Sequence, residues 1–524
     1  MARRNVAGRV SQYSFAQVPT ANIPRSVFNR SHTHKTTFHG DELIPVFIDE
    51  ALPGDTMSMK ATFFGRMATP IYPVMDNMYI ETFFFAVPVR LVWDNWQKFH
   101  GEQVDPGDSI DFQVPTMTES PVSFSLSEYM GVPIQNTLTF SSLWHRAYNL
   151  IWNEWFRDEN LQDSVVVDKD DGPDTSTDYV LLKRGKRHDY FTSCLPFAQK
   201  GTAVELPLGT TADVVADATG IPTFDLGTST DVRLRAGTDQ DDARWSVNGQ
   251  VGFDAAWNTT GLEVDLTSAT AATINQIREA FQIQRLLERD ARGGTRYTEI
   301  IRSHFGVMSP DQRLQRPEFL GGSSNHINTT PVARVQEPTT PSGDKQPLGR
   351  LAGFTTFSGS ASWVKSFTEH CLLIGLANVR ADLTYQQGLE RMFSRSTRYD
   401  FYYPAFAHLG EQEVLNKEIF ADGSANDDLV FGYQERWAEY RYKPSRVSGQ
   451  FRSDVGASSL DPWHLSIDFG SLPSLNATFI EGNSPWTRVQ AVTNLSDFIA
   501  DFGFNYRCAR PMPTFSVPGL IDHF

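Results

Sequence analysis

The residues of this chain that could do chemistry are spaced without a catalytic pattern. Glu411 with Glu413, and Glu435 with Glu439, are carboxylate pairs of the kind that glycosidases use as acid and base. A chain with 62 acidic residues offers such pairs by chance, so they carry little weight. The sequence has no phosphate-binding loop, dinucleotide motif, nucleophile elbow or HExxH zinc motif. We therefore expect a protein that is not an enzyme and that needs no cofactor.

The histidines and cysteines do not form a recognisable site either. His32, His34 and His39 lie close together, but no cysteine or carboxylate stands at ligand spacing from them. His370 directly precedes Cys371, and neighbouring residues of a strand point to opposite faces, so the two cannot form a catalytic dyad. We expect no metal site from these residues.

An acidic run, DKDDGPDTSTD at 168–178, contains five aspartates and is followed by the basic segment 183–187. Hard cations such as calcium prefer carboxylate ligands. However, Gly172 comes one place too early for an EF-hand, and Pro173 and a missing final glutamate break that pattern. The pattern favours an acidic surface loop that faces the basic segment. Whether this loop also binds an ion is left open.

The net charge of −16 argues against nucleic acid as a partner, but the charge is unevenly distributed. Residues 1–40 contain no acidic residue, and the remaining chain has 40 basic and 62 acidic residues. A basic arm on an acidic body is typical of a segment that contacts phosphates. A solvated tail that lies over a neighbouring subunit explains the same composition. The candidate DNA-contacting residues of the arm are Arg3, Arg4, Arg9, Arg25, Arg30 and Lys35.

The stretch from Ile44 to Trp93 predicts the opening strands of a β-sandwich. Residues 57–64 alternate between apolar and polar side chains, which indicates a half-buried strand. Residues 78–89 include three consecutive phenylalanines, which indicates a strand buried on both faces. Further along, residues 370–383 and 501–510 are also expected to be buried strands.

Two helices and one long loop are expected in addition. Residues 141–161 carry apolar side chains, three tryptophans among them, at spacings of three and four, with Ser141 or Ser142 as the N-cap. We expect this apolar stripe to pack over a sheet. A second helix begins at Thr273 and ends at Gly293. Residues 321–353 are rich in Gly, Pro, Ser and Thr, which predicts a long loop.

Residues 202–272 differ in composition from the rest. They hold 11 acidic and three basic residues and few large apolar ones, too few for an independent core. The segment is predicted to be an insertion of short strands and loops that faces solvent. It either meets a partner or receptor or is a variable loop region. The receptor-facing candidates are Phe224, Trp245, Phe253 and Trp257.

The amino-acid composition indicates the structural class of the protein and the cellular compartment in which it is made. The 524 residues include 37 Phe, 37 Gly and 29 Pro, which favours β-rich structure with many loops. The three cysteines (Cys194, Cys371 and Cys508) are far apart, so no disulfide framework is expected and a reducing compartment is indicated. No apolar stretch approaches the length of a membrane helix, and the N-terminus lacks the apolar core of a signal peptide. We expect a soluble protein made in the cytoplasm.

Several motifs together resemble the major capsid proteins of the microviruses, in particular the gokushovirus group of small single-stranded DNA phages. The resemblance runs nearly end to end and in order, and is weak in detail only at 202–272. The motifs include FNRSHTHKTTFHGDELIPVFIDEALPGDT (from residue 28), SCLPFAQKG (193–201), LQRPEFLGGSS (314–324), STRYDFYYPAF (396–406), FGYQERWAEYRYKPSRVSGQFRS (431–453) and SLDPWHLS (459–466).

This resemblance implies an all-β-dominated fold, an eight-stranded viral jelly roll with long loop insertions and a few helices. The chain would then divide into a basic arm (1–40), a first part of the jelly roll (41–201), the insertion (202–272), and the second part with long loops (273–524). The resemblance also implies self-assembly into a T=1 icosahedral shell, with the insertion protruding at the threefold axes toward a host receptor.

The implied partners are other copies of the chain, packaged circular single-stranded DNA, a small basic DNA-binding protein, a pilot protein and an internal scaffolding protein. The virion would assemble in the cytoplasm of a host bacterium, without membrane insertion. Aromatic and basic residues alternate in the 431–446 motif, which suits single-stranded nucleic acid or a subunit interface. For a capsid protein we favour the interface, with candidates Tyr433, Arg436, Trp437, Tyr440, Arg441 and Tyr442. A carbohydrate-binding β-sandwich protein is the alternative function.

Overall fold

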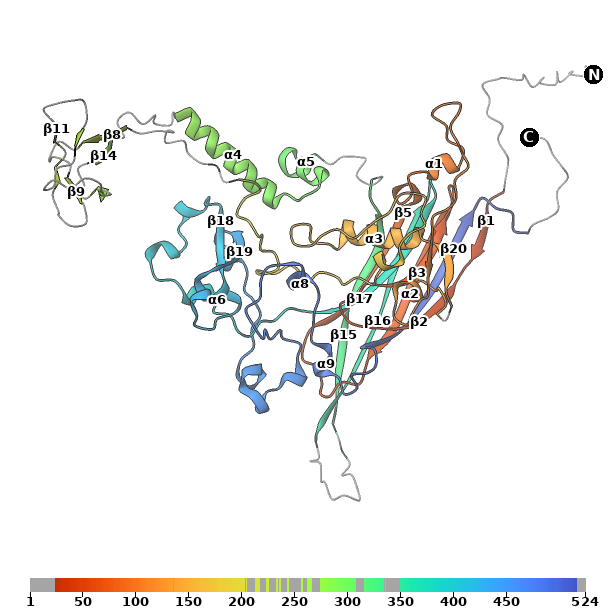
Figure 1. The fold of residues 1–524 in the computed structure, drawn as a ribbon. Coiled ribbons are helices and arrows are strands. Elements are labelled where there is room, and N and C mark those ends of the chain that lie inside the picture. Colours follow the sequence, from red (N-terminus) through yellow and green to blue (C-terminus); the bar gives the residue numbers. More distant parts are fainter. Residues whose placement is uncertain are drawn as a thin grey trace, which may run out of the picture. The chain divides into compact units, whose positions relative to one another are not determined.

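The computed structural model describes residues 24–515, apart from residue 135, most of 203–273, residues 308–314 and most of 334–348. Within 203–273 it describes little more than short strands. The chain divides into two compact units, residues 199–294 and the remainder. The larger unit contains a long antiparallel sheet and a loop-rich layer (Figure 1).

Nine strands form the long sheet, and all of their pairings are antiparallel. Their order is β1-β20-β4-β16-β15-β5-β17-β3, and β2 lies end to end with β1 along β20. The strands are β1 (Ser26–Asn29), β2 (His32–Phe38), β3 (Ile44–Ala51), β4 (Thr56–Met67), β5 (Met78–Pro88), β15 (Glu318–Ala333), β16 (Leu351–Ser366), β17 (Cys371–Ala381) and β20 (Phe498–Arg510).

This order is that of a jelly roll. Counting β1 and β2 as one position, there are eight strand positions in two halves: β1/β2, β20, β4 and β16 in one, and β15, β5, β17 and β3 in the other. The sheet curls so that the halves face each other over one core (Figure 1). Phe47 of β3 meets Phe504 and Tyr506 of β20, with ring centroids 5.2 and 5.5 Å apart. The expected jelly roll is therefore confirmed.

The alternation seen in the sequence has its physical cause in this packing. In β4, Met57, Met59, Ala61 and Phe63 are buried in the core, and the residues between them are exposed. Strand β5 is buried on both faces, as predicted, because it separates two clusters. Phe84 belongs to the core between the halves, and its neighbours on the other face lie beneath a helix.

That helix is α3 (Leu143–Trp155), which confirms the predicted apolar stripe. Ser142 occupies the N-cap position without a side-chain bond, and Ser141 Oγ accepts the N–H of Leu143 at 3.4 Å. Smaller elements surround the helix. They are η1 (Val89–Leu91), α1 (Trp96–Phe99), β6 (Thr116–Glu119), α2 (Leu126–Tyr129), β7 (Leu138–Ser141), η2 (Ser176–Asp178) and α5 (Tyr297–Phe305). No helix of the described chain is long and apolar enough to cross a membrane.

Two segments differ from their prediction. Residues 321–353 are not one long loop, because β15 extends to Ala333 and β16 begins at Leu351. Residues 26–38, part of the arm for which a solvated tail was one interpretation, form β1 and β2 and pair with β20. The expected strands at 370–383 and 501–510 are present as β17 and β20. All three cysteines are buried, and none of them forms a disulfide.

A loop-rich layer with its own small core follows β17. It contains two paired strands and several short helices. They are η4 (Arg391–Phe393), η5 (Arg398–Asp400), η6 (Pro404–Phe406), β18 (Glu411–Leu415), α6 (Asn416–Ile419), η7 (Ala425–Asp428), β19 (Val430–Glu435), α7 (Ala438–Arg441), η8 (Gly449–Phe451), η9 (Ser453–Ser458), η10 (Asp461–Trp463), α8 (Ala477–Ile480) and α9 (Trp486–Val489).

The smaller unit contains short paired strands and one long helix. Strand β9 pairs with β10 and β13, β11 with β12, and β14 with β8. The elements are β8 (Asp213–Ala216), β9 (Thr223–Asp225), β10 (Val232–Arg233), β11 (Arg235–Ala236), β12 (Ala243–Arg244), β13 (Ala256–Trp257), β14 (Leu262–Asp265) and α4 (Ile274–Arg292). Helix α4 confirms the helix expected from Thr273 to Gly293.

Candidate subunit interface

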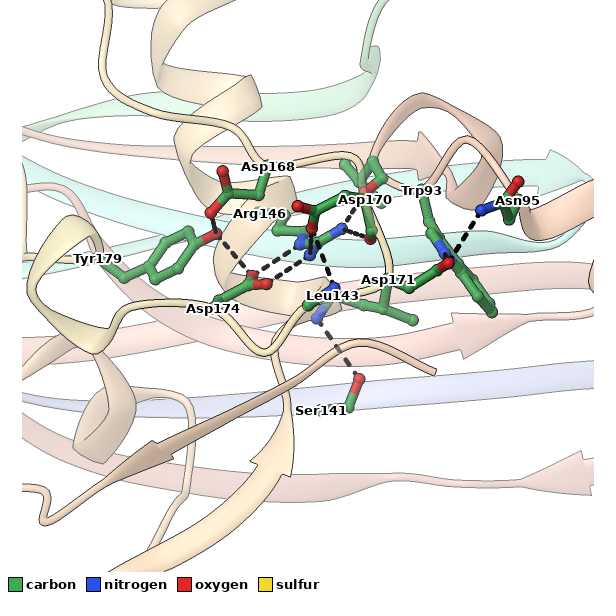
Figure 2. Close-up of polar contacts among 12 residues, drawn as sticks. Trp93, Asn95, Ser141, Leu143, Arg146, Asp168, Asp170, Asp171, Asp174 and Tyr179 are labelled. Atoms are coloured by element: carbon green, nitrogen blue, oxygen red, sulfur yellow. Dashed lines mark hydrogen bonds and ion pairs between the residues drawn. The ribbon is translucent and has the colours of Figure 1, made fainter. Parts of the chain in front are cut away.

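The acidic loop 168–178 is organised around a buried arginine (Figure 2). The side chains of Arg146, on α3, and Asp174 are 0% exposed and form a two-pronged ion pair, with Nε 2.7 Å from one carboxylate oxygen. Nη1 of Arg146 donates to the carbonyls of Val92 and Asp170 at 3.0 and 2.9 Å. Burial opposes the charged carboxylate, but the hydrogen bonds from Arg146 hold the pKa of Asp174 below its ordinary value.

Two further aspartates of the loop, Asp168 and Asp171, also accept hydrogen bonds from protein donors (Figure 2). The Tyr179 hydroxyl donates to Asp174 and Asp168 at 2.8 and 3.3 Å. The indole N–H of Trp93 donates to Asp171 at 2.7 Å. Among the described residues, no cluster of three or more His, Cys, Asp or Glu side chains could hold a metal ion. The contacts with Arg146, Tyr179 and Trp93 hold the loop 168–178 over α3, and we call this loop the clamp.

The expectation that this loop faces the basic segment 183–187 is wrong. Arg184 pairs with Glu81 of β5, Lys186 donates to the carbonyl of Phe479 at 2.7 Å, and Arg187 pairs with Asp382 at 3.1 Å. Arg184 pairs there because Glu81 is a buried carboxylate within a largely apolar strand, where an unpaired charge is costly.

A buried histidine beside the clamp predicts a pH dependence of stability. His145 of α3 is buried, and burial lowers its pKa to about 4. The unfolded chain binds this proton below about pH 6.5, whereas the folded chain excludes it until about pH 4. The stability that the folded chain gains from a neutral His145 is therefore full above pH 6.5 and is lost as the pH falls toward 4. Between pH 7 and pH 5 we expect this loss to lower the free energy of unfolding by about 2 kcal/mol.

Denaturant titrations of wild type and His145→Gln at pH 7 and pH 5 measure this contribution. The glutamine retains a partner for Ser127, whose hydroxyl lies 2.9 Å from Nε2 of His145. We expect the variant to lose less stability on acidification than wild type. His408→Gln, at an exposed site, should behave as wild type. Equal losses for wild type and His145→Gln would contradict the prediction.

The described part of the N-terminal arm is bound to the sheet. Arg25 donates to Thr56 Oγ1 and to the carbonyl of Ala509 at 3.0 and 3.3 Å. Arg30 pairs with Asp49, and Lys35 lies 3.5 Å from Asp501 with an exposed side chain. The other three predicted DNA-contacting residues (Arg3, Arg4 and Arg9) lie outside the described residues. DNA contact by the arm stays a prediction.

The loop-rich layer exposes many aromatic side chains. Tyr399 and Phe393 are 67% and 63% exposed. The rings of Tyr402 and Tyr440 lie 6.3 Å apart. We call this set the aromatic–arginine surface. It consists of Phe393, Tyr399, Phe401, Tyr402, Tyr403 and Tyr440 together with Arg395, Arg398 and Arg436.

Two arginines of this surface lie over its rings. The guanidinium of Arg395 is 4.3 Å from the ring centre of Tyr440 and pairs with Glu439 at 3.4 Å. Arg398 lies 5.6 Å from the ring of Tyr403. Such stacking holds long side chains in place, so a partner meets a preorganised surface. Exposed Tyr and Arg in one patch are typical of binding interfaces.

The six predicted interface residues do not all reach this surface. Tyr440 and Tyr442 are exposed, and Arg441 is exposed and paired with Glu435. Trp437 is buried, and its indole N–H donates to the carbonyl of Phe406 at 3.0 Å. The other two are half-buried: Arg436 stacks on Trp437 at 4.6 Å, and Tyr433 forms a backbone bridge to Leu195.

The exposed run at 399–403 was not among the predicted interface residues, although four aromatic residues among five neighbours are a visible signal. In the insertion, Phe224 of β9 and Trp257 of β13 are paired along the backbone. Trp245 and Phe253 lie outside the described residues. Receptor contact by these four stays a prediction.

Comparison with known proteins identifies the family. Residues 16–520 match the family described as capsid protein (F protein). The chain is 48% identical to capsid protein VP1 of Bdellovibrio phage phiMH2K, over 99% of this chain and all of the relative. It is 41% identical to capsid protein VP1 of Chlamydia phage 1, with the same coverage, and 35% identical to that of Spiroplasma virus 4, over 97% of each chain. The chain therefore belongs to the F-type phage capsid protein family, in its microvirus (gokushovirus) group.

Proposed function

We propose that this capsid protein assembles with copies of itself into a closed T=1 icosahedral shell around circular single-stranded DNA, and that it has no enzymatic role. The observation that carries the proposal is the aromatic–arginine surface. Contiguous aromatic side chains exposed on a single chain mark an interaction site, because a soluble monomer seldom leaves such a patch uncovered. In a capsid protein, the partner that is always available is another copy.

The two units of the chain suit two roles in such a shell. The jelly roll is a rigid core from which long loops extend to neighbours. The insertion 202–272, acidic and rich in short strands, is the candidate for host attachment. A small basic DNA-binding protein, a pilot protein and an internal scaffolding protein are proposed as further virion or assembly partners.

Electron microscopy and sedimentation of the purified full-length chain test the proposal, first alone and then with the neighbouring phage proteins co-expressed. We expect closed particles of uniform size in at least the second condition. Particles purified from infected cells are a third sample, and we expect these to contain single-stranded DNA. Monodisperse monomers in both conditions would contradict assembly, and uniform shells that never contain DNA would contradict enclosure alone.

A further inference from the structure

One face of the jelly roll differs in charge from the rest of the chain. The outward-facing residues of β1/β2, β20, β4 and β16 include four basic side chains and one acidic side chain, Asp501, which pairs with Lys35. In the whole chain, acidic residues outnumber basic ones by 62 to 46. We call this set of outward-facing residues the basic sheet face. Its other three basic residues are Lys60, Arg66 and Arg507.

These three cations are exposed, and none of them pairs with a carboxylate among the described residues. Lys60 lies opposite Asn505, and Arg507 lies opposite Ser58, so the two cations are diagonal neighbours on adjacent strands. Diagonal neighbours lie about 7 to 8 Å apart, a distance at which like charges repel. A bound polyanion would relieve this repulsion.

Aromatic rings and hydroxyls accompany the charges. Phe64 of β4 and Phe354 of β16 are exposed, and they line a hollow of about 640 Å³. Its charged lining residues are Lys35, Arg66, Asp501 and Glu128. Ser360 and Ser362 of β16 lie opposite Thr62 and Lys60, so hydroxyls stand beside the cations. Lys60 and Arg66 are six residues apart on one strand, a span of about 20 Å that accommodates several nucleotides.

We propose that the basic sheet face binds single-stranded DNA, with Lys60, Arg66 and Arg507 on phosphates and Phe64 and Phe354 stacked on bases. This assignment rests on the proposed enclosure of DNA and adds a specific face to it. Cations with flat rings on a strand surface suit single-stranded nucleic acid of any sequence, because every base has a face on which to stack. It follows that this face of the sheet lies toward the interior of the shell.

Fluorescence anisotropy of the full-length chain with a labelled oligothymidylate of about 30 nucleotides tests the proposal across a range of salt concentrations. Each phosphate contact contributes about −0.7 to the slope of log affinity against log salt. The variant K60Q/R66Q/R507Q should therefore lose about 2 units of slope and at least about tenfold in affinity. F64A/F354A should lose about tenfold or more in affinity and keep the slope.

The matched control K98Q/K169Q/K183Q removes the same charge from solvent-accessible lysines outside this face. It should keep the wild-type slope. Suppose that wild type binds the oligonucleotide. Equal losses of slope and affinity in the control and the face variant would then overturn the assignment of the face, and so would a face variant with the wild-type slope and affinity. A wild-type chain that binds no oligonucleotide would overturn DNA binding itself. If the face variant instead loses only self-association in sedimentation, the face contacts protein and the proposal is wrong.

Discussion

Arg146→Met is expected to lower the free energy of unfolding by about 3–5 kcal/mol, because it leaves Asp174 charged and buried without its partner. The guanidinium also donates to the carbonyls of Val92 and Asp170, so two further acceptors lose their donor. Denaturant titration at pH 7, followed by tryptophan fluorescence, measures the loss. Trp93 hydrogen-bonds to the same loop and should report its opening.

Two further variants show whether the loss comes from the unpaired charge. Arg146→Met combined with Asp174→Leu removes both ions and should recover much of the stability, since apolar groups of similar size replace a buried pair at little cost. Arg90→Met breaks a half-exposed pair with Glu369 and should cost about 1 kcal/mol or less. If Arg146→Met were as mild as Arg90→Met, the buried ion pair would not be what holds the clamp.

The sequence predicted the strands whose burial is regular. Strand β4 alternates because one face covers the core and the other meets solvent, and β5 is largely apolar on both faces because it separates two clusters. Strand β15 was missed because its glycines suggest a loop. They are needed there: a bulge lies between Phe319 and Gly321, and a Cβ on Gly322 would lie 2.1 Å from the carbonyl oxygen of Thr82. Local composition does not reveal such a close approach.

The edge strands and the clamp could not be predicted for a related reason. Strand β2 is polar and largely exposed, and within the part of the chain that the structure describes its only strand partner is β20, more than 450 residues away. Arg146 is a charged residue within the apolar pattern of α3, and a sequence pattern places such a residue on the side of the helix that faces solvent. Its partner is set by how the loop 168–178 folds back over α3, and this depends on long-range packing.

The candidate interface was predicted in part because its signal is compositional. Mixed Tyr, Trp and Arg in 433–442 indicated a surface, but the pattern could not say which rings face outward. Trp437 adopts a positive φ of 69°, and its ring is buried beneath Tyr402, with ring centroids 5.6 Å apart. Apart from Tyr440, the exposed aromatic residues of the aromatic–arginine surface therefore come from the neighbouring segment 392–406.

Phe393→Ser combined with Tyr399→Ser is expected to abolish shell formation and leave the monomer folded. The two rings are the most exposed of the aromatic–arginine surface, so their removal costs the isolated chain little. At an interface, a buried aromatic anchor contributes about 2 kcal/mol or more, which is roughly 30-fold in affinity per contact. A closed shell repeats each contact in every copy, so the loss accumulates over the particle. Sedimentation and electron microscopy measure the yield of particles.

Tyr297→Ser combined with Phe305→Ser is the matched control, because these aromatic residues of α5 are 76% and 77% exposed, close to the values of the tested pair. Circular dichroism and thermal unfolding of all three proteins establish that each is folded. Shells from the control but not from Phe393→Ser/Tyr399→Ser would locate a subunit contact at the aromatic–arginine surface. Full shell yield from Phe393→Ser/Tyr399→Ser would show that these rings face solvent in the particle, and the copies would then have to meet through other loops. Loss of shells in both variants would mean that exposed aromatic residues contribute to assembly wherever they lie, so that this surface has no special role.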